Sequence, residues 1–268
     1  MCAANGHPAP YGVKQRELGN EIFGTWVRGH ATAEVYANSA VRYAKAMRAV
    51  DPTIKLIAVG KGVMAGQDEW NSAVLRIAGS VIDYLAIHDY TTLTQNAIVA
   101  NPRAQMMARA GEFEASYRHS GDLVAKFAPG RDIKLIINEW NLFYGADVLE
   151  SVEGAVYASR MMNGFERDGN IVDSNCVSDL LNGWVGGVIQ ASRDRVCGTP
   201  QFYALKMYND HLGTERLHAE VNSSELEAGL QSVDAVVTRS GNGQRVYVKL
   251  SNANRIQGVK AMIALRML

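Results

Sequence analysis

Hydrophobic residues gather in short unbroken runs, and between these runs apolar positions recur every three or four residues. The runs with the composition of strands are Val13–Gly19, Ile54–Val59, Val81–Ile87, Ile133–Asn138 and Trp184–Gln190. The middle three are almost wholly apolar, which is typical of parallel strands buried on both faces. The pattern therefore predicts one parallel sheet whose strands are separated by helices.

Helical periodicity fills the intervening segments. The segment Ala31–Val50 predicts a helix whose apolar face holds Tyr36, Ala40, Tyr43, Met47 and Val50. Further helices are predicted over Gln67–Gly79, Ala104–Phe127, Val152–Arg167 and Gln201–His211. Strand and helix thus alternate, which indicates an α/β fold with about five βα units, a partial (β/α) barrel of the TIM type, since a closed barrel has eight units.

The pattern changes after about Gly213 to short alternating segments. They are Leu217–Val221, Val233–Thr238, Arg245–Leu250 and Lys260–Leu265, with the turn Ser240–Gly243 between the second and the third. Alternation with turn residues predicts antiparallel β structure. We therefore expect a barrel-type catalytic region over residues 1–213 and a short, partial β-sandwich segment over residues 214–268.

Composition narrows the possible partners. The 268 residues include 27 basic and 27 acidic side chains, so nothing indicates binding to nucleic acid or to a membrane surface. The sequence has no long uncharged apolar segment and no signal-peptide pattern, so we expect a soluble, cytoplasmic protein. The three cysteines are widely spaced, which favours reduced thiols, and no histidine or cysteine spacing matches a metal site. We expect no cofactor.

Two Asn-Glu pairs are the main candidates for chemistry. Glu21 follows Asn20 and Glu139 follows Asn138, each at the end of a strand-like run. Barrel enzymes carry their active sites at the C-terminal ends of the strands. Hydrolysis of a glycosidic bond with retention needs two carboxyl groups about 5–5.5 Å apart. The sequence therefore predicts Glu21 and Glu139 as a catalytic pair, although a lone glutamate at such a position is more often a helix cap or a surface charge.

Aromatic residues follow both glutamates. Phe23 and Trp26 come after Glu21, and Trp140 and Phe143 come after Glu139. Aromatic faces suit the apolar C–H surface of a sugar ring, so Trp26 and Trp140 are candidates for substrate binding. In the alternative, Trp140 and Phe143 only seal the top of the barrel.

Polar residues close two other runs. His88 and Tyr90 follow Val81–Ile87, where the Tyr90 hydroxyl could orient a nucleophilic carboxylate. The alternative is a buried polar pair that satisfies backbone groups at the strand end. Gln190 ends the last run and could bind a sugar hydroxyl or be a loop residue.

Several segments resemble, in order, those of glycoside hydrolase family 51, the α-L-arabinofuranosidases. They are Ala3–Pro8, Tyr11–Lys14, Glu17–Glu21, Ile87-His88 with Tyr90, Asn138–Asn141, and Thr199-Pro200 with Tyr203. The family belongs to a clan of barrels with the acid/base on strand four and the nucleophile on strand seven. The resemblance implies that Glu21 is the acid/base, that Glu139 is the nucleophile and that Asn20 binds the sugar 2-hydroxyl. It also implies that His88, Tyr90 and Gln190 line the glycone pocket.

The resemblance begins at the family's fourth strand, so strands four to eight are expected and the pocket of one chain would be incomplete. The chain also departs from the family at Gln15-Arg16, where aromatics are usual, and at Asn138, where Asp is usual. Five parallel strands leave two open edges, so we expect two or more copies to associate. The chain could equally be a piece of a longer reading frame.

Three functional interpretations remain open. The first is a retaining exo-glycosidase of hemicellulose-derived sugars that removes terminal α-L-arabinofuranosyl units. The second is a β-xylosidase or exo-xylanase with the same machinery, so that the partner is an arabinose- or xylose-containing oligosaccharide. The third is a catalytically silent remnant that binds sugar weakly or serves as an assembly unit.

Overall fold

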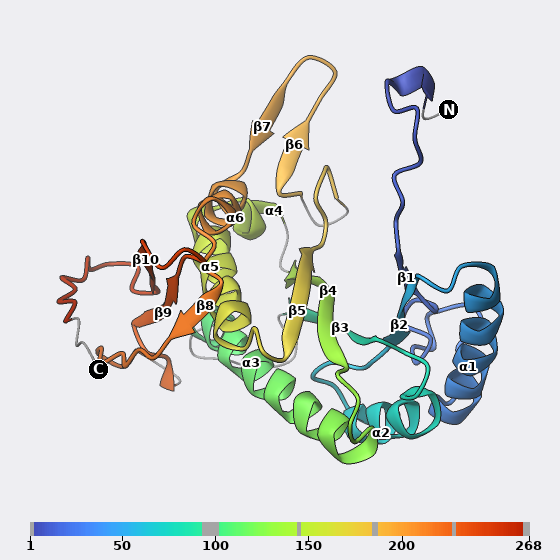
Figure 1. Ribbon diagram of the computed structural model, residues 1–268. Helices are drawn as coiled ribbons and strands as arrows, with labels where there is room; N and C mark the ends of the chain where they lie inside the picture. The colour runs from blue at the N-terminus through green and yellow to red at the C-terminus, as the bar shows by residue number, and fades with distance from the viewer. Residues whose placement is uncertain (1–2, 93–101, 144–145, 184–186, 227–228, 265–268) are drawn as a thin grey trace. The chain divides into compact units, whose positions relative to one another are not determined.

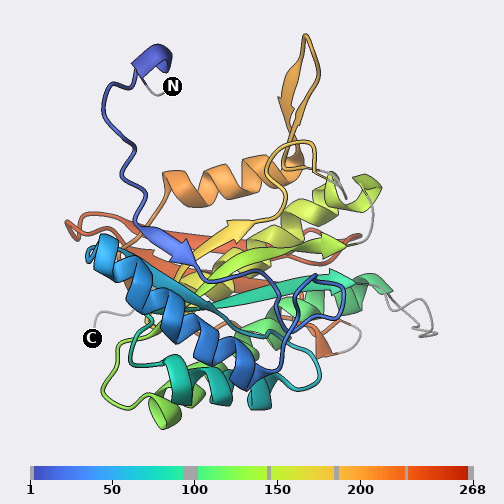
Figure 2. The ribbon, with the colours of Figure 1, turned by 90° about the vertical axis from the view of Figure 1, so that its right-hand side faces the viewer.

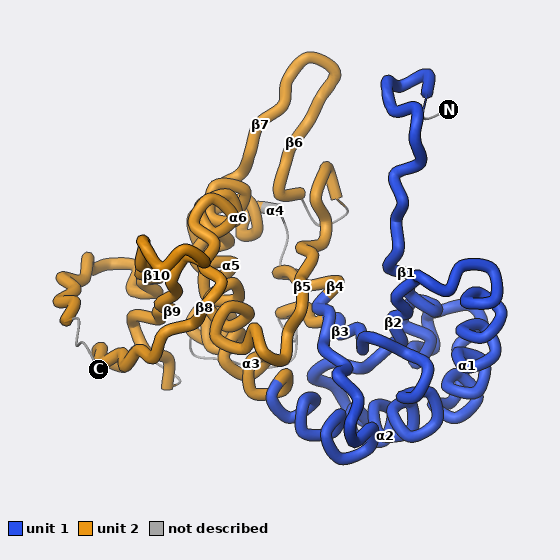
Figure 3. The backbone as a smooth tube through the Cα atoms, in the orientation of Figure 1, with its two compact units in different colours: residues 1–88, 118–137 blue, residues 89–117, 138–268 orange. Residues whose placement is uncertain are grey.

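The computed structural model describes residues 3–92, 102–143, 146–183, 187–226 and 229–264. The chain divides into two compact units (Figure 3). Unit 1 comprises residues 1–88 and 118–137, and unit 2 comprises residues 89–117 and 138–268. Each unit is described below by itself.

Five strands form one sheet in the order β1-β2-β3-β4-β5 (Figure 1). Their bounds are β1 Gln15–Glu17, β2 Lys55–Val59, β3 Tyr84–Thr92, β4 Lys134–Phe143 and β5 Val172–Val177. Strand β2 pairs in parallel with both of its neighbours, since Ile57 is in register with Glu17 and with Tyr84. Sequential parallel strands joined by helices confirm the predicted partial (β/α) barrel.

Six α-helices lie within the described residues. They are α1 Ala33–Val50, α2 Gln67–Ala78, α3 Pro102–Phe127, α4 Ala146–Leu149, α5 Val152–Arg167 and α6 Pro200–Asp210, and a short 3₁₀ helix, η1, covers Ala3–Asn5. The helices predicted from periodicity are confirmed, and the four-residue α4 was not predicted. Side-chain caps fix the starts of α1, α5 and α6: Thr32, Ser151 and Thr199 each accept a hydrogen bond from a backbone N–H of the first turn.

The buried face of α1 differs from the prediction. Tyr36 and Ala40 are buried as expected, but Tyr43 is 61% exposed and Val50 is 88% exposed. The buried side chains are instead Tyr36, Ala37, Ala40 and Ala44. Three of these four buried side chains are alanines, whose small size lets the helix approach its neighbours closely. The Tyr36 oxygen accepts a hydrogen bond of 2.7 Å from the Val59 N–H, which fastens α1 to the end of β2.

The fifth strand was predicted in the wrong place. It is Val172–Val177, which is polar and only partly buried, as an edge strand can be, so it has no apolar run. Within the predicted run Trp184–Gln190, residues 184–186 lie outside the described part. The rest leads into β6 (Ile189–Ala191), which pairs antiparallel with β7 (Val196–Gly198). Figures 1 and 2 show this pair as a hairpin that extends from the helices of unit 2.

The C-terminal segment forms an antiparallel sheet in the order β10-β9-β8, which confirms the predicted change of structure. Its strands are β8 Glu215–Leu217, β9 Val233–Arg239 and β10 Val246–Asn252. The predicted turn Ser240–Gly243 joins the last two. The predicted strand Leu217–Val221 is wrong beyond its first residue, because β8 ends at Leu217. Residues 260–264 form no strand, and Leu265 lies outside the described residues.

Each unit has its own apolar core. In unit 1, Ile57, Ala86 and Ile136 pack together, with Tyr84 against them. In unit 2, Trp140 and Tyr157 are fully buried, and Phe165 packs edge-on against Trp140. Among the described helices, none is long and apolar enough to cross a membrane.

Candidate active site

Glu21 lies in a tight turn after β1. The Leu18 N–H donates to the Ile57 carbonyl at 2.9 Å, so the chain stays in register with β2 up to this point. Gly19 then has a φ of 119° and Glu21 a φ of 47°. A side chain at Gly19 would meet Ile22 at 2.8 Å, which explains the glycine. A left-handed backbone conformation costs free energy at a glutamate, so the contacts of Glu21 must hold it in place.

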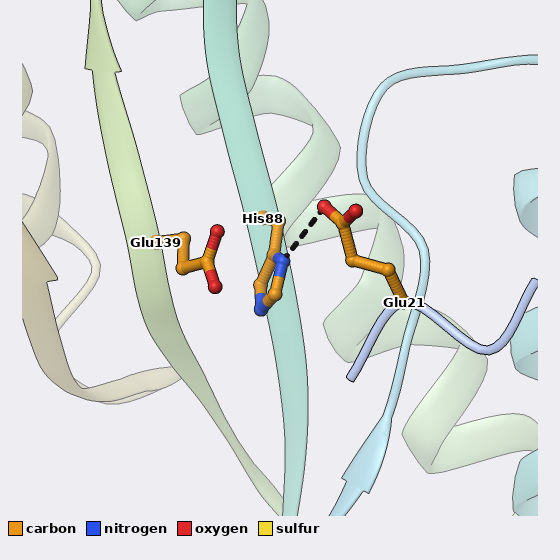
Figure 4. A group of neighbouring side chains, drawn as sticks. All are labelled: Glu21, His88 and Glu139. Atoms are coloured by element: carbon orange, nitrogen blue, oxygen red, sulfur yellow. Dashed lines mark hydrogen bonds and ion pairs between the residues drawn. The ribbon is translucent and has the colours of Figure 1, made fainter. Parts of the chain in front are cut away.

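Two donors hold the Glu21 carboxylate. His88 Nδ1 lies 3.0 Å from Oε1, a contact that a dashed line marks in Figure 4, and Trp26 Nε1 donates to Oε2 at 2.7 Å. These contacts lower the pKa of Glu21; the His88 hydrogen bond is the largest cause, and burial partly opposes it. Because Glu21 is then an ionised acceptor, His88 must carry a proton on Nδ1. The Trp26 ring remains 65% exposed and offers a face to a ligand.

Glu139 lies on β4 (Figure 4) and has a phenol as its partner. The Tyr90 hydroxyl donates to Glu139 Oε2 at 2.9 Å. Burial is the main cause that raises the pKa of Tyr90, so the phenol keeps its proton and acts as a donor. Its ring packs edge-on against Phe143 at 6.3 Å. A neutral donor therefore contributes to the orientation of this carboxylate.

Trp140 belongs to the core of unit 2. The side chain is 0% exposed, its Nε1 donates to Asn175 Oδ1 at 3.1 Å, and its ring lies 5.5 Å from that of Phe165. A buried ring offers no face to a sugar. The position thus favours the alternative in which Trp140 seals the core.

Gln190 and Asn20 have contrasting surroundings. The Gln190 amide donates to Glu150 Oε1 at 2.8 Å and to the Gly187 carbonyl at 3.0 Å, so it is engaged at the base of the β6–β7 hairpin. Asn20 is exposed beside Glu21, where its amide is accessible to a ligand. Of these two residues, only Asn20 is thus placed to bind a sugar without a change of partner.

The structure brings the predicted residues together in two sets, Glu21 with His88 and Trp26 in unit 1, and Glu139 with Tyr90 in unit 2. Neither set supplies three protein ligands by itself, which is the usual minimum for zinc. Sequence patterns missed Glu150, whose Oε1 accepts a hydrogen bond from the Gln190 amide. No motif marks that glutamate, because only the tertiary structure brings it to Gln190.

Two family models match the chain and together span most of it. The model described as the alpha-L-arabinofuranosidase 1 domain matches residues 1–109, and the alpha-L-arabinofuranosidase C-terminal domain matches residues 138–265. The chain belongs to the α-L-arabinofuranosidases of glycoside hydrolase family 51. Glu21 and His88 lie in the first matched segment, and Glu139 lies in the second.

This chain matches only part of the length of each named arabinofuranosidase. The intracellular exo-alpha-(1->5)-L-arabinofuranosidase 1 of Bacillus subtilis is 35% identical over 144 residues, which are 53% of this chain and 28% of that protein. The probable alpha-L-arabinofuranosidase C of Aspergillus clavatus is 26% identical over 243 residues, 83% of this chain and 47% of that protein. The chain therefore spans about half or less of the length of these curated relatives.

A solved arabinofuranosidase structure has the same fold. The alpha-L-arabinofuranosidase from Thermotoga maritima, crystallised as an arabinose complex, matches with a TM-score of 0.79 and 26% sequence identity. The match covers 93% of this chain and 54% of that one. The resemblance found in the motifs is confirmed, as is the fold that it implied.

Proposed function

We propose that this chain carries the catalytic carboxylates of a retaining, exo-acting α-L-arabinofuranosidase. Glu139 is the nucleophile and Glu21 the acid/base. The observation that carries the proposal is the Tyr90–Glu139 hydrogen bond in a chain of this family, because a phenol donor fixes the orientation of a carboxylate without removing its charge.

The reaction follows the double-displacement scheme. Glu139 attacks the anomeric carbon while the departing glycosidic oxygen takes a proton from Glu21, which leaves a glycosyl-enzyme ester. Glu21, now ionised, then takes a proton from water, and the resulting attack on the ester releases the sugar with retained configuration. The scheme requires the two carboxyl groups to lie about 5–5.5 Å apart, and their separation is part of the proposal.

The substrate is an oligosaccharide that ends in arabinose or xylose. Asn20 is exposed and can donate to the sugar 2-hydroxyl, and the exposed Trp26 face can lie against the ring. His88 and Tyr90 would line the glycone pocket. Gln190 would first have to leave Glu150 before its amide could bind a sugar hydroxyl.

One observation favours a second candidate, a sugar-binding protein without turnover. A general acid must be protonated before the reaction, yet His88 and Trp26 lower the pKa of Glu21 and favour the carboxylate. Without a change in these contacts, Glu21 could bind a sugar hydroxyl but would rarely donate a proton. Saccharide binding with no turnover would support this second function.

The deciding experiment is hydrolysis of 4-nitrophenyl α-L-arabinofuranoside and 4-nitrophenyl β-D-xyloside by the purified protein. Glu21→Gln and Glu139→Gln should each lose turnover, whereas the exposed Glu69→Gln on α2 serves as the matched control and should keep it. The glycoside that is hydrolysed faster identifies the sugar that the protein prefers. Equal rates in all four proteins would mean that these glutamates are not the catalysts.

Rescue of activity by azide distinguishes the nucleophile from the acid/base. In Glu139→Ala, azide would attack in place of the nucleophile and give a glycosyl azide of inverted configuration. In Glu21→Ala, azide would attack the glycosyl-enzyme and give a retained product. The opposite pair of products would exchange the two assignments.

We also propose that the partner is a second copy of the chain and that the protein acts inside the cell. Strand β1 has β2 as its one neighbour in the described sheet, and Tyr11 and Val13 lie exposed just before it. The Bacillus subtilis relative is named intracellular. Light scattering at micromolar concentration should show a dimer or larger species, and a monodisperse monomer would exclude the association.

A further inference from the structure

A cavity of about 310 Å³ lies within unit 2, and it shares no residue with the candidate active site. Much of its wall is apolar. Ala110 and Gly111 of α3 line it, together with Leu230 before β9 and Val233 at the start of β9. Pockets that hold small organic ligands begin at about 300 Å³, so this cavity has room for one small molecule.

Gly111 gives access to the space inside the cavity. It lies within α3, where glycine is a poor helix former, and a Cβ added to it would meet no neighbouring atom within 4 Å. Close packing therefore does not require this glycine. Because Gly111 lines the cavity, a larger side chain there would occupy the open space without removing any polar group.

Arg160, on α5, places a buried cation at the cavity. The residue is 9% exposed, and its Nη1 donates to the Gln231 carbonyl over a long 3.4 Å. Its Nε is buried without a hydrogen-bond partner, and no carboxylate of the described residues forms an ion pair with Arg160. Burial is the main cause that lowers the pKa of this guanidinium. Buried charges are normally paired, so Arg160 has donors to offer to a ligand.

The two carboxylates at the cavity are bound by other donors. Arg167 donates to Glu114 Oε2 at 2.6 Å and to Asp234 Oδ1 at 2.8 Å. Asn163 donates to the other Asp234 oxygen at 2.8 Å. The two arginines balance the two carboxylates, so the four charged side chains that line the cavity sum to zero. A ligand with one negative charge is therefore favoured over a phosphate dianion, which the carboxylates would repel more strongly.

We propose that this cavity binds a small organic monocarboxylate with an apolar body. The ligand's carboxylate accepts hydrogen bonds from the Arg160 guanidinium, which matches the planar geometry of a carboxylate. Its apolar body lies against Ala110, Gly111 and Leu230. The site involves none of the residues proposed for catalysis, so it stands or falls independently of the proposed function.

Ligand-detected NMR titration of the purified protein with benzoate tests the site, and benzamide serves as the neutral probe of the same shape. We expect benzoate to bind at least about tenfold more tightly than benzamide, because a hydrogen bond between two charged groups is stronger than one to a neutral acceptor. Equal affinities, or no binding of benzoate at millimolar concentration, would overturn the inference.

Two variants place the bound benzoate in this cavity. Arg160→Met removes the cation, and Gly111→Leu fills the space while it keeps the cation and improves the helix. Each should weaken benzoate binding at least about tenfold, and the matched control Arg245→Met, at an exposed arginine, should bind as the wild type does. Circular dichroism checks that each variant is folded. If Arg160→Met does not fold, Gly111→Leu decides alone, and unchanged benzoate affinity in folded Gly111→Leu would refute the site.

Discussion

Replacing Arg167 by Met should destabilise unit 2 more than any loss of a surface ion pair. Arg167 ends α5, and its guanidinium binds Glu114 on α3 through two bonds, Nε to Oε1 at 2.9 Å and Nη2 to Oε2 at 2.6 Å. Its Nη1 also donates to Asp234 Oδ1 at 2.8 Å and to the Ala235 carbonyl at 2.9 Å on β9. One side chain thus links two helices to the C-terminal sheet.

The expected loss of unfolding free energy follows from the burial of the three charged side chains. The side chains of Arg167, Glu114 and Asp234 are only 23%, 9% and 17% exposed. Removing the cation leaves two carboxylates in a poorly solvated environment, and breaking a buried pair in this way typically costs about 3–5 kcal/mol. Native proteins are stable by only about 5–15 kcal/mol, so a large part of the free energy of unfolding would be lost.

Urea unfolding followed by tryptophan fluorescence and circular dichroism measures the loss. The matched control is Arg239→Met, because Arg239 and Glu215 form an ion pair whose side chains are 43% and 52% exposed. An exposed pair contributes at most about 1 kcal/mol, so this variant should unfold close to the wild-type midpoint. If Arg167→Met is no less stable than Arg239→Met, the reasoning from burial is wrong.

Three further predictions concern the site residues. His88→Phe removes the largest cause that lowers the pKa of Glu21, so the alkaline limb of kcat/KM should move to higher pH; a limb that stays in place would contradict the acid role. Because that pKa is lowered on folding, Glu21 stabilises the fold above its unfolded pKa and loses this contribution in acid, so the stability difference between wild type and Glu21→Gln should shrink as pH falls below about 4. Trp140→Ala should lower stability by about 3–5 kcal/mol in chemical denaturation. Trp26→Ala should leave stability nearly unchanged but raise KM for the arabinofuranoside, and equal stability losses in the two tryptophan variants would refute this distinction.

The parts of the fold that sequence could predict are those with strong local signals. Strands β2, β3 and β4 contain unbroken apolar runs, and α5 has the predicted bounds Val152–Arg167 because Ser151 caps its start. The sequence placed His88 and Tyr90 at one rim, directly after the apolar run Val81–Ile87, and in the structure the Tyr90 hydroxyl donates to Glu139. Local sequence was sufficient there because burial on both faces demands apolar residues throughout.

The remaining features depend on tertiary contacts. Strand β5 contains the polar run Asp173–Asn175 and lies at the edge of the described sheet, so its sequence resembles a loop. Whether Tyr43 and Trp140 are buried depends on what packs against them. Hydrophobicity alone wrongly predicted that Tyr43 is buried, and it left the position of Trp140 open. The contact of Gln190 with Glu150 joins residues 40 positions apart in the chain, and no short-range pattern encodes it.

The two glutamates follow the same residue type in sequence but have different electrostatic surroundings. Glu139 has a phenol donor, whereas Glu21 has an imidazole and an indole that together lower its pKa. Acid catalysis requires the opposite direction. A sugar bound against Trp26 would bury Glu21 further and could draw the indole N–H away, and both changes raise the pKa of a carboxyl group. We therefore expect a bound arabinoside to raise the pKa of Glu21, measured by carboxyl 13C titration in Glu139→Gln; an unchanged titration would favour the sugar-binding protein without turnover.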